Sequence, residues 1–141
     1  MEKESLNKHS TTNDEQQVKN IIIEFTNVMN KWEKKFCRNS SDPKLAIEIK
    51  DIFDKYCTKK DRKYGRPNAL SAGDPPEYDV KHNIIEKIEK EKNKFIVYIQ
   101  QTNRFKQLYR IFVVKNRDKQ FKIDRKERFS SPDNKWERVG L

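Results

Sequence analysis

The period of the hydrophobic pattern changes partway along this 141-residue chain, and that change limits the folds open to it. Before residue 57, apolar residues recur at the i, i+3, i+4, i+7 spacing of amphipathic helices. After residue 79, they alternate with polar residues at the period of two that is typical of strands. A chain whose helices precede its strands favours an α+β fold, with the N-terminal helices packed on one curved antiparallel sheet.

Two helices are predicted in the first half of the chain. The first begins at a capping-box sequence with Thr12 as its N-cap, and its apolar stripe covers residues 18–36. The second follows the Ser-Asp-Pro sequence at residues 41–43, which supplies an N-cap and a proline for the first helical position. Its stripe covers residues 45–56, and the short link predicts an antiparallel helical pair.

Four strands are predicted in the second half. They are the segments 83–90, 94–101, 107–114 and 119–126. Their short connections favour an antiparallel meander. The third segment is apolar on both faces, which predicts a central strand. In the fourth segment, Lys126 is assigned to a half-exposed face opposite Phe121 and Ile123, and the tail with Trp136 is expected to pack back on the sheet.

The length and composition indicate one basic domain. Only 33% of the residues are hydrophobic and 38% are charged, but the apolar residues are periodic, which argues against wholesale disorder. Residues 1–11 have no apolar face and are predicted to be a flexible lead-in to a single domain over residues 12–141. The formal charge of +10 is concentrated in residues 57–66 and 104–128, which points to an acidic partner, a polyanion or simply solubility.

The search for catalytic and metal-binding motifs is negative. The sequence contains no Gly-rich phosphate loop, nucleophile elbow or histidine–carboxylate metal motif, so we expect no catalytic residue, cofactor or metal. Cys37 and Cys57 lack a C-x-x-C spacing and are expected to be reduced and at least partly buried. The polar N-terminus has no signal-peptide pattern and no apolar run could span a membrane, which predicts a cytoplasmic location.

The stretch from Tyr56 to Asp79 separates the helices from the strands and concentrates backbone-shaping residues. It holds two of the three glycines and three of the five prolines, which permit positive φ or fix φ and so predict a loop of one defined shape. Its acids are expected to pair with its arginines. The candidates for shaping the loop or contacting a partner are Arg62, Tyr64, Arg66, Glu77, Tyr78 and Asp79.

The sequence also resembles a known family. "YCTKKDRKYGR" at the end of a helix, then "SAGDPPEYD", "FKID" and a final "NKWERVGL" are similar to bacterial immunity proteins with the nuclear-transport-factor-2-like fold, found in polymorphic toxin systems. The resemblance extends from about Glu15 to the C-terminus. It implies a cone-like fold and a non-enzymatic function, which is to bind and neutralise a cognate toxin domain.

Two other functions stay open. A small-molecule-binding or vestigial enzyme domain of the same fold is one. A basic nucleic-acid-binding module is the other, suggested by aromatic residues among basic strands. It is the weaker of the two, because Phe105, Tyr109, Phe121 and Phe129 mostly follow the alternation expected for a core.

The charge predicts the kind of surface that the toxin presents. Inhibitors that cover the nucleic-acid groove of a nuclease meet a positive surface and are expected to be acidic, whereas this chain is basic. We therefore expect an acidic partner surface. Arg117, Lys119 and Lys122 are the candidates for meeting it, and both a monomer and a dimer are compatible with the sequence.

Overall fold

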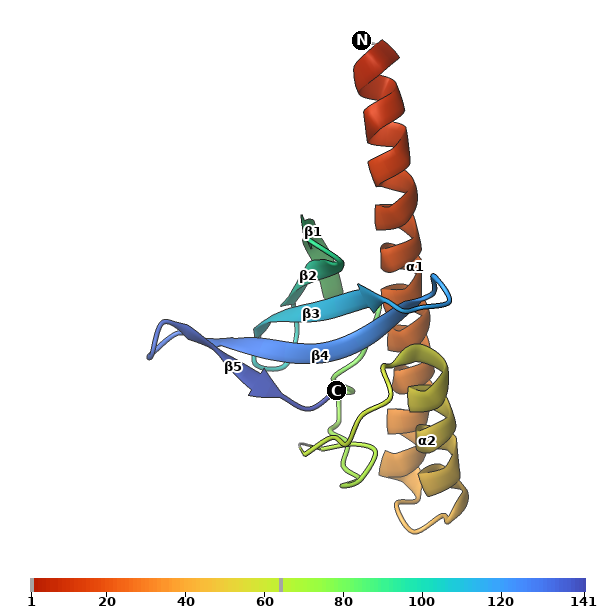
Figure 1. Cartoon of the computed structure of the whole chain (residues 1–141). Coiled ribbons are helices and arrows are strands. Elements are labelled where there is room, and N and C mark those ends of the chain that lie inside the picture. The colour runs from red at the N-terminus through yellow and green to blue at the C-terminus, as the bar shows by residue number, and fades with distance from the viewer. Residues whose placement is uncertain (1, 64) are drawn as a thin grey trace.

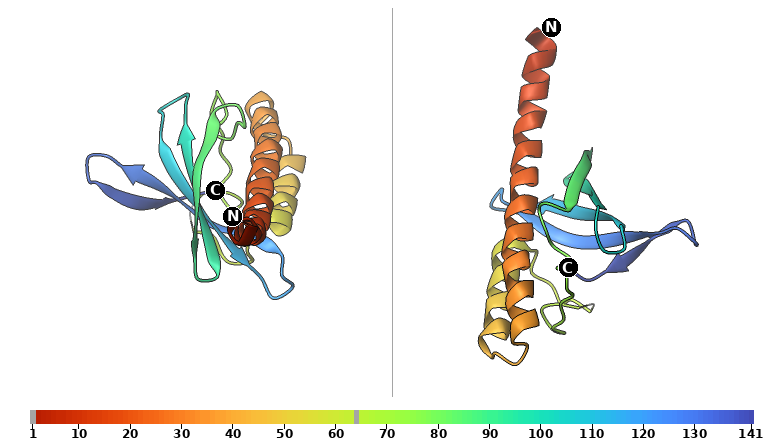
Figure 2. Two further views of the ribbon diagram at one scale, coloured as in Figure 1. Left: turned by 90° about the horizontal axis from the view of Figure 1, so that it is seen from above. Right: turned by 180° about the vertical axis from the view of Figure 1, so that it is seen from behind.

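The structure, a computed structural model, describes residues 2–63 and 65–141. Its elements are α1 (Glu2–Arg38), α2 (Lys44–Tyr56), β1 (Asn83–Glu91), β2 (Lys94–Gln101), β3 (Leu108–Lys115), β4 (Phe121–Ser130) and β5 (Lys135–Val139). The strands form one antiparallel sheet in the order β1-β2-β3-β4-β5. The two helices lie side by side against the same face of this sheet (Figures 1 and 2). The predicted α+β arrangement is confirmed.

The first helix is longer than predicted, and the second begins one residue later than predicted, at Lys44. α1 begins at Glu2, so the expected helix start at Thr12 is wrong; residues 2–11 contain no Gly or Pro to end the helix. This N-terminal part extends beyond the sheet (Figure 1). The flexibility of residues 1–11 stays a prediction. Pro43, rather than Ser41 or Asp42, is the N-cap of α2, and Asp42 Oδ1 accepts the Lys44 N–H at 3.0 Å.

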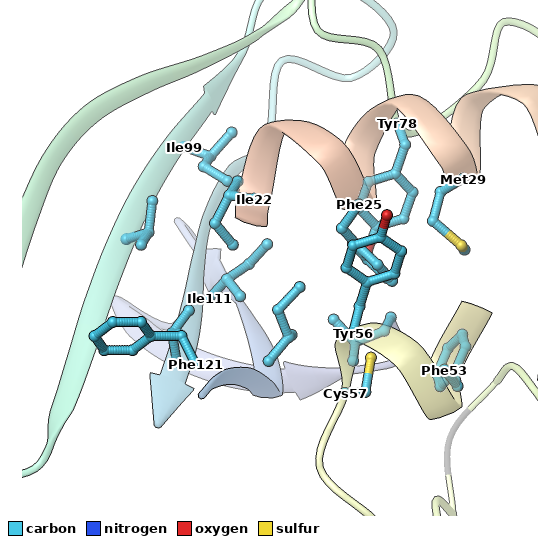
Figure 3. Close-up of a cluster of buried hydrophobic side chains, with 14 of the residues drawn as sticks. Ile22, Phe25, Met29, Phe53, Tyr56, Cys57, Tyr78, Ile99, Ile111 and Phe121 are labelled. Carbon is cyan, nitrogen blue, oxygen red and sulfur yellow. The ribbon is translucent and has the colours of Figure 1, made fainter. Parts of the chain in front are cut away.

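The core forms between α1, α2 and the inner face of the sheet. In α1, Val18, Ile22, Phe25, Met29 and Trp32 are all at most 2% exposed, which confirms the burial of this stripe. Phe25 lies at the centre, with its ring edge-to-face against the rings of Phe53, Tyr56 and Tyr78 (Figure 3). The aromatic cluster therefore joins both helices to Tyr78, near the end of the loop between α2 and β1.

The sheet has five strands rather than the four predicted. β3 is central as expected, but the tail around Trp136 forms β5, paired with β4 from Lys126–Val139 to Ser130–Lys135. The turn between them holds Asn134 at a φ of 52°, a conformation that Asn tolerates well. The β4–β5 hairpin projects away from the helices (Figures 1 and 2).

A bulge in β4 changes which side chains face the helices. Phe112 pairs with Arg125 and Val113 pairs with Ile123, so Asp124 is an extra residue on β4. Such a residue reverses the alternation that follows it. Lys126 therefore lies on the inner face with its side chain 3% exposed, and its predicted half-exposed position is wrong.

The two cysteines differ in their surroundings. Cys57, where α2 ends, is buried, and Thr58 begins the central loop by donating its N–H to the Ile123 backbone oxygen at 2.9 Å. Burial raises the pKa of the Cys57 thiol to about 12. Cys37 is exposed, so the prediction of partial burial is wrong for this residue; both cysteines are free thiols.

Candidate functional site

Arg66, from the central loop (residues 57–82), lies at the centre of a buried polar cluster. The residue is 5% exposed, and its Nη1 lies 3.0 Å from Oε2 of Glu33 in α1. Its Nε donates to the backbone oxygen of Leu141 at 3.0 Å, and Nη1 donates to the backbone oxygen of Ser71 at 3.2 Å. One guanidinium thus joins the helix, the loop and the C-terminal segment.

Glu33 is the buried counterpart of Arg66. It is 1% exposed, and its second oxygen accepts the Tyr78 N–H at 2.9 Å. Burial raises the pKa of the Glu33 carboxyl, while Arg66 and the Tyr78 N–H oppose that rise. Both carboxylate oxygens have partners, as a buried charge requires. The sequence-based prediction did not include Glu33, although its place four residues after Met29 puts it on the apolar face of α1.

A second pair, between the buried Lys126 and the half-buried Glu77, joins the loop to the sheet. The Lys126 ammonium bonds to Glu77 Oε2 and lies 3.2 Å from the Tyr78 hydroxyl. It also lies over the rings of Tyr78 and Tyr109, 4.3 and 4.1 Å from their centroids. Burial lowers the pKa of Lys126; burial also works to raise the pKa of Glu77, but Lys126 holds that pKa below its ordinary value. The predicted pairing of Glu77 with the loop arginines is wrong, because the bulge in β4 brings Lys126 inside.

The other loop candidates also make contacts within the fold. Arg62 donates to the backbone oxygens of Asp124 and Thr58, each at 2.9 Å, so its predicted pairing with a loop acid is wrong. Asp79 accepts the Lys81 N–H at 3.0 Å in a local turn that leads into β1. Tyr64 lies outside the described residues.

A pocket of about 340 Å³ opens beside the Arg66 cluster. The central loop forms one wall, Arg104 from the β2–β3 connection and Arg128 from β4 contribute cationic side chains, and Tyr109 from β3 faces the same space. We call it the arginine pocket; its lining is Glu33, Gly65, Arg66, Ser71, Ala72, Gly73, Glu77, Arg104, Tyr109, Arg128, Val139, Gly140 and Leu141. Among the described residues, no three His, Cys, Asp or Glu side chains are placed to hold a metal ion.

The opposite face of the sheet carries an aromatic patch. We define it as Tyr98 on β2, Arg110 on β3, Phe129 on β4 and Trp136 on β5. The Trp136 ring lies 5.9 Å from the Tyr98 ring and 5.3 Å from the Phe129 ring, and the Arg110 guanidinium lies 4.2 Å above it. All four residues are half-buried, and both helices lie on the other face (Figure 2). The prediction left Trp136 in a tail because it ended the fourth strand at residue 126, whereas β4 continues to Ser130 and forms a hairpin with β5.

The cations singled out by sequence have different roles. Arg117 and Lys119 are exposed in the β3–β4 turn, but Lys122 donates to the Lys55 backbone oxygen at 2.6 Å at the end of α2. A separate hollow beside β4 and β5 is lined, among the described residues, by four cations and no Asp or Glu. We call these four the cationic rim: Arg62, Lys63, Arg125 and Arg138.

These features define a class of protein: a curved antiparallel sheet wrapped on a long helix, with a polar pocket on one side and an uncovered face on the other. The chain belongs to the family of NTF2 fold immunity proteins, whose model matches residues 17–140. It is 37% identical over 128 residues to the Immunity protein RhsIA of Dickeya dadantii (strain 3937), a similarity that covers 86% of this chain and 93% of that protein. No solved structure matches the chain.

Family membership confirms three expectations drawn from the sequence. The resemblance to bacterial immunity proteins, the cone-like α+β fold and the immunity function all hold. None of the helices in the described part of the chain is long and apolar enough to cross a membrane.

Proposed function

We propose that the chain neutralises a cognate toxin domain by binding it, without enzymatic turnover, through the aromatic patch on the outer face of the sheet. The observation that carries this proposal is the composition of that uncovered face. Trp, Tyr and Arg are the residue types that dominate binding hot spots, and the patch places one Trp, one Tyr and one Arg in mutual contact.

The patch is also held in place before any partner arrives. Arg110 Nε and Nη2 lie 2.7 and 2.6 Å from Oε1 of Glu127, its cross-strand neighbour. The Tyr98 hydroxyl donates to Glu89 at 2.9 Å. Side chains that are already ordered lose less conformational entropy on binding, which favours a tight complex.

The cationic rim supports an acidic partner surface. Charges at the edge of an interface act mainly on the association rate, because they attract the partner before contact. The side chains of Lys63 and Arg138 in this rim are exposed and make no hydrogen bond or ion pair to the residues that the structure describes. We therefore place the acidic part of the toxin surface beside the edge formed by β4 and β5.

Trp136→Ala is expected to weaken the complex with the cognate toxin domain by about 2 kcal/mol or more, or roughly thirtyfold in Kd. The loss follows because Trp136 is the ring that the other three patch residues contact. Isothermal titration calorimetry gives the affinity. Phe105→Ala is the matched control, since Phe105 is 76% exposed in the β2–β3 connection and outside the patch. Equal affinities of the two folded variants would contradict the proposed interface.

Two charge-matched double variants test the electrostatic part. Lys63→Gln with Arg138→Gln, and Arg117→Gln with Lys119→Gln, each lower the formal charge from +10 to +8. We expect the first pair to slow association several-fold more than the second. The wild-type association rate is expected to fall as salt rises past ~0.1 M, where the Debye length is about 10 Å. Stopped-flow kinetics measure both effects, and identical rates for both pairs would place the acidic surface elsewhere. Lys122 is left unchanged because it contacts the end of α2.

A cytoplasmic location is part of the proposal. Cys37 and Cys57 are both free thiols, the usual state in a reducing compartment. A small-molecule-binding function is the second candidate, and the arginine pocket is the observation that favours it.

A further inference from the structure

The arginine pocket lies on the other side of the sheet from the aromatic patch. Tyr109 and Arg128 are register partners on the inner face, whereas Arg110 and Glu127, the next pair along, point outward. The pocket volume of about 340 Å³ falls within the usual range for small-molecule sites. The pocket is therefore separate from the aromatic patch, whereas the hollow of the cationic rim shares Val139, Gly140 and Leu141 with it.

The acidic side chains of the pocket are already neutralised. Glu33 is paired with Arg66, and Glu77 is paired with Lys126. Two guanidinium groups are then left facing the open space. The Arg104 side chain makes no hydrogen bond or ion pair to the described part of the chain, and the Arg128 side chain makes one ion pair there, with Nη2 3.3 Å from Oε2 of Glu137. The pocket therefore has an excess of positively charged donors.

Tyr109 adds a neutral donor to the same space. Its hydroxyl has no hydrogen-bond partner among the described residues. Burial and the nearby Glu77 carboxylate raise the pKa of Tyr109 to about 12, so the hydroxyl keeps its proton at neutral pH. Two guanidinium groups and one phenol can thus donate hydrogen bonds to a single ligand.

The Arg104 guanidinium lies against a glycine in the facing wall. A Cβ atom on Gly73 would lie 2.8 Å from Arg104 Nη2, so the missing side chain leaves room for the end of the Arg104 side chain. Gly73 does not adopt the positive φ that glycine permits. Gly65, by contrast, does have a φ of 64°. The Arg104 guanidinium therefore lies between the loop backbone and the pocket.

We propose that the arginine pocket binds a small molecule through a carboxylate or phosphate group, held by Arg104, Arg128 and the Tyr109 hydroxyl. Guanidinium groups match the geometry of both oxyanions and bind them through paired N–H donors. An apolar guest would leave these donors without partners, which is costly in a partly buried site. The proposed ligand is therefore an oxyanion rather than an apolar molecule.

The test is an NMR titration of the full chain with inorganic phosphate and, separately, with succinate, at constant ionic strength. We expect saturable shifts of the Gly73 and Gly140 amides with at least one probe, and the more effective probe identifies the anion class. Arg104→Gln is expected to weaken binding by about tenfold or more, and Arg117→Gln, which removes the same charge from an exposed turn, is expected to leave it unchanged. Tyr109→Phe removes only the hydroxyl and is expected to lower the anion affinity by less than Arg104→Gln does.

Several outcomes overturn this proposal without touching the toxin interface. Absence of saturable binding with both probes would do so, and so would equal weakening by Arg104→Gln and Arg117→Gln, which would indicate a general charge effect. Toxin affinity is measured in parallel and is expected to be the same for wild type and Arg104→Gln. A selective loss of toxin affinity in Arg104→Gln would assign the pocket to an acidic side chain of the toxin instead.

Discussion

Trp32→Ala is expected to lower the free energy of unfolding by about 3–5 kcal/mol, the usual cost of truncating a large buried aromatic residue. Trp32 is 1% exposed and stacks on Phe36 with ring centroids 5.2 Å apart. Its Nε1 also donates to the Leu45 backbone oxygen at 2.9 Å, so the variant loses both packing and the link between α1 and α2. Because domains of this kind have total stabilities of about 5–15 kcal/mol, the loss is a large part of the whole.

Urea denaturation monitored by circular dichroism measures this loss. Ile47→Ala is the matched control: Ile47 lies on α2 but is 64% exposed, and its truncation is expected to change stability by less than about 0.5 kcal/mol. Trp32→Phe keeps a large ring and removes the indole N–H, so an intermediate loss is expected. A Trp32→Ala variant as stable as Ile47→Ala would refute the assignment of this stripe to the core.

Arg66→Met is expected to cost about 3–5 kcal/mol, because it keeps much of the side-chain volume but leaves Glu33 buried without a countercharge. The guanidinium also lies over the rings of Trp32 and Tyr78, 5.5 and 5.7 Å from their centroids, and these contacts are lost as well. The loop from residue 65 to residue 78 is then expected to become more mobile. Hydrogen exchange of its amides reports that change separately from global unfolding.

A double variant shows whether the stability loss in Arg66→Met comes from leaving the Glu33 carboxylate without its countercharge. Glu33→Gln keeps an oxygen that can accept the Tyr78 N–H but removes the carboxylate. Combined with Arg66→Met, it is expected to restore part of the lost stability. If the two changes instead add, the buried-charge explanation fails.

The stability of Arg66→Met should also depend on pH in a defined direction. Without Arg66, the folded-state pKa of Glu33 lies further above the ordinary value of about 4.3. A carboxyl whose folded pKa is raised destabilises the fold as pH rises through that pKa, and the penalty disappears below the unfolded value. The deficit relative to wild type should therefore be smaller near pH 4 than near pH 7. The double variant lacks this carboxyl and should lose the effect.

The two internal ion pairs also affect how much charge is available for binding a partner. Glu33 with Arg66 and Glu77 with Lys126 cancel within the fold, so the formal excess of +10 belongs to side chains nearer the surface. The ion pairs that hold the loop and the exposed cations Lys63 and Arg138 are thus different sets of residues. A surface can change its charge to suit a new toxin without disturbing the internal pairs.

Much of the fold could be predicted because it depends on local patterns. The stripe from Val18 to Trp32 shows the helical period directly, and it is the buried face of α1. The alternation in β2 and β3 likewise identifies the inner residues, such as Val97 and Ile111. The motifs around the central loop identified the family, because they combine residue types at fixed spacing that few other chains share.

The candidate site could be predicted only in part, because its contacts join residues far apart in the chain. Arg66 was recognised as a key residue, but its partner Glu33 is 33 positions away and Lys126 is 49 positions from Glu77. One extra residue at Asp124 decides whether Lys126 faces the helices or the solvent, and nothing in the local alternation shows where a bulge falls.

By itself, the sequence determined the order of the elements, the buried faces of the helices and the family, since these depend on short-range periodicity and motif spacing. Only the tertiary structure decided which charges pair, that the tail becomes β5, and that Trp136 and Arg110 meet on the outer face. The physical reason is that ion pairs and strand registers are chosen by which surfaces the packed core brings together. The chemistry of a side chain determines which groups it can bind, and the fold determines which groups lie within contact distance of it.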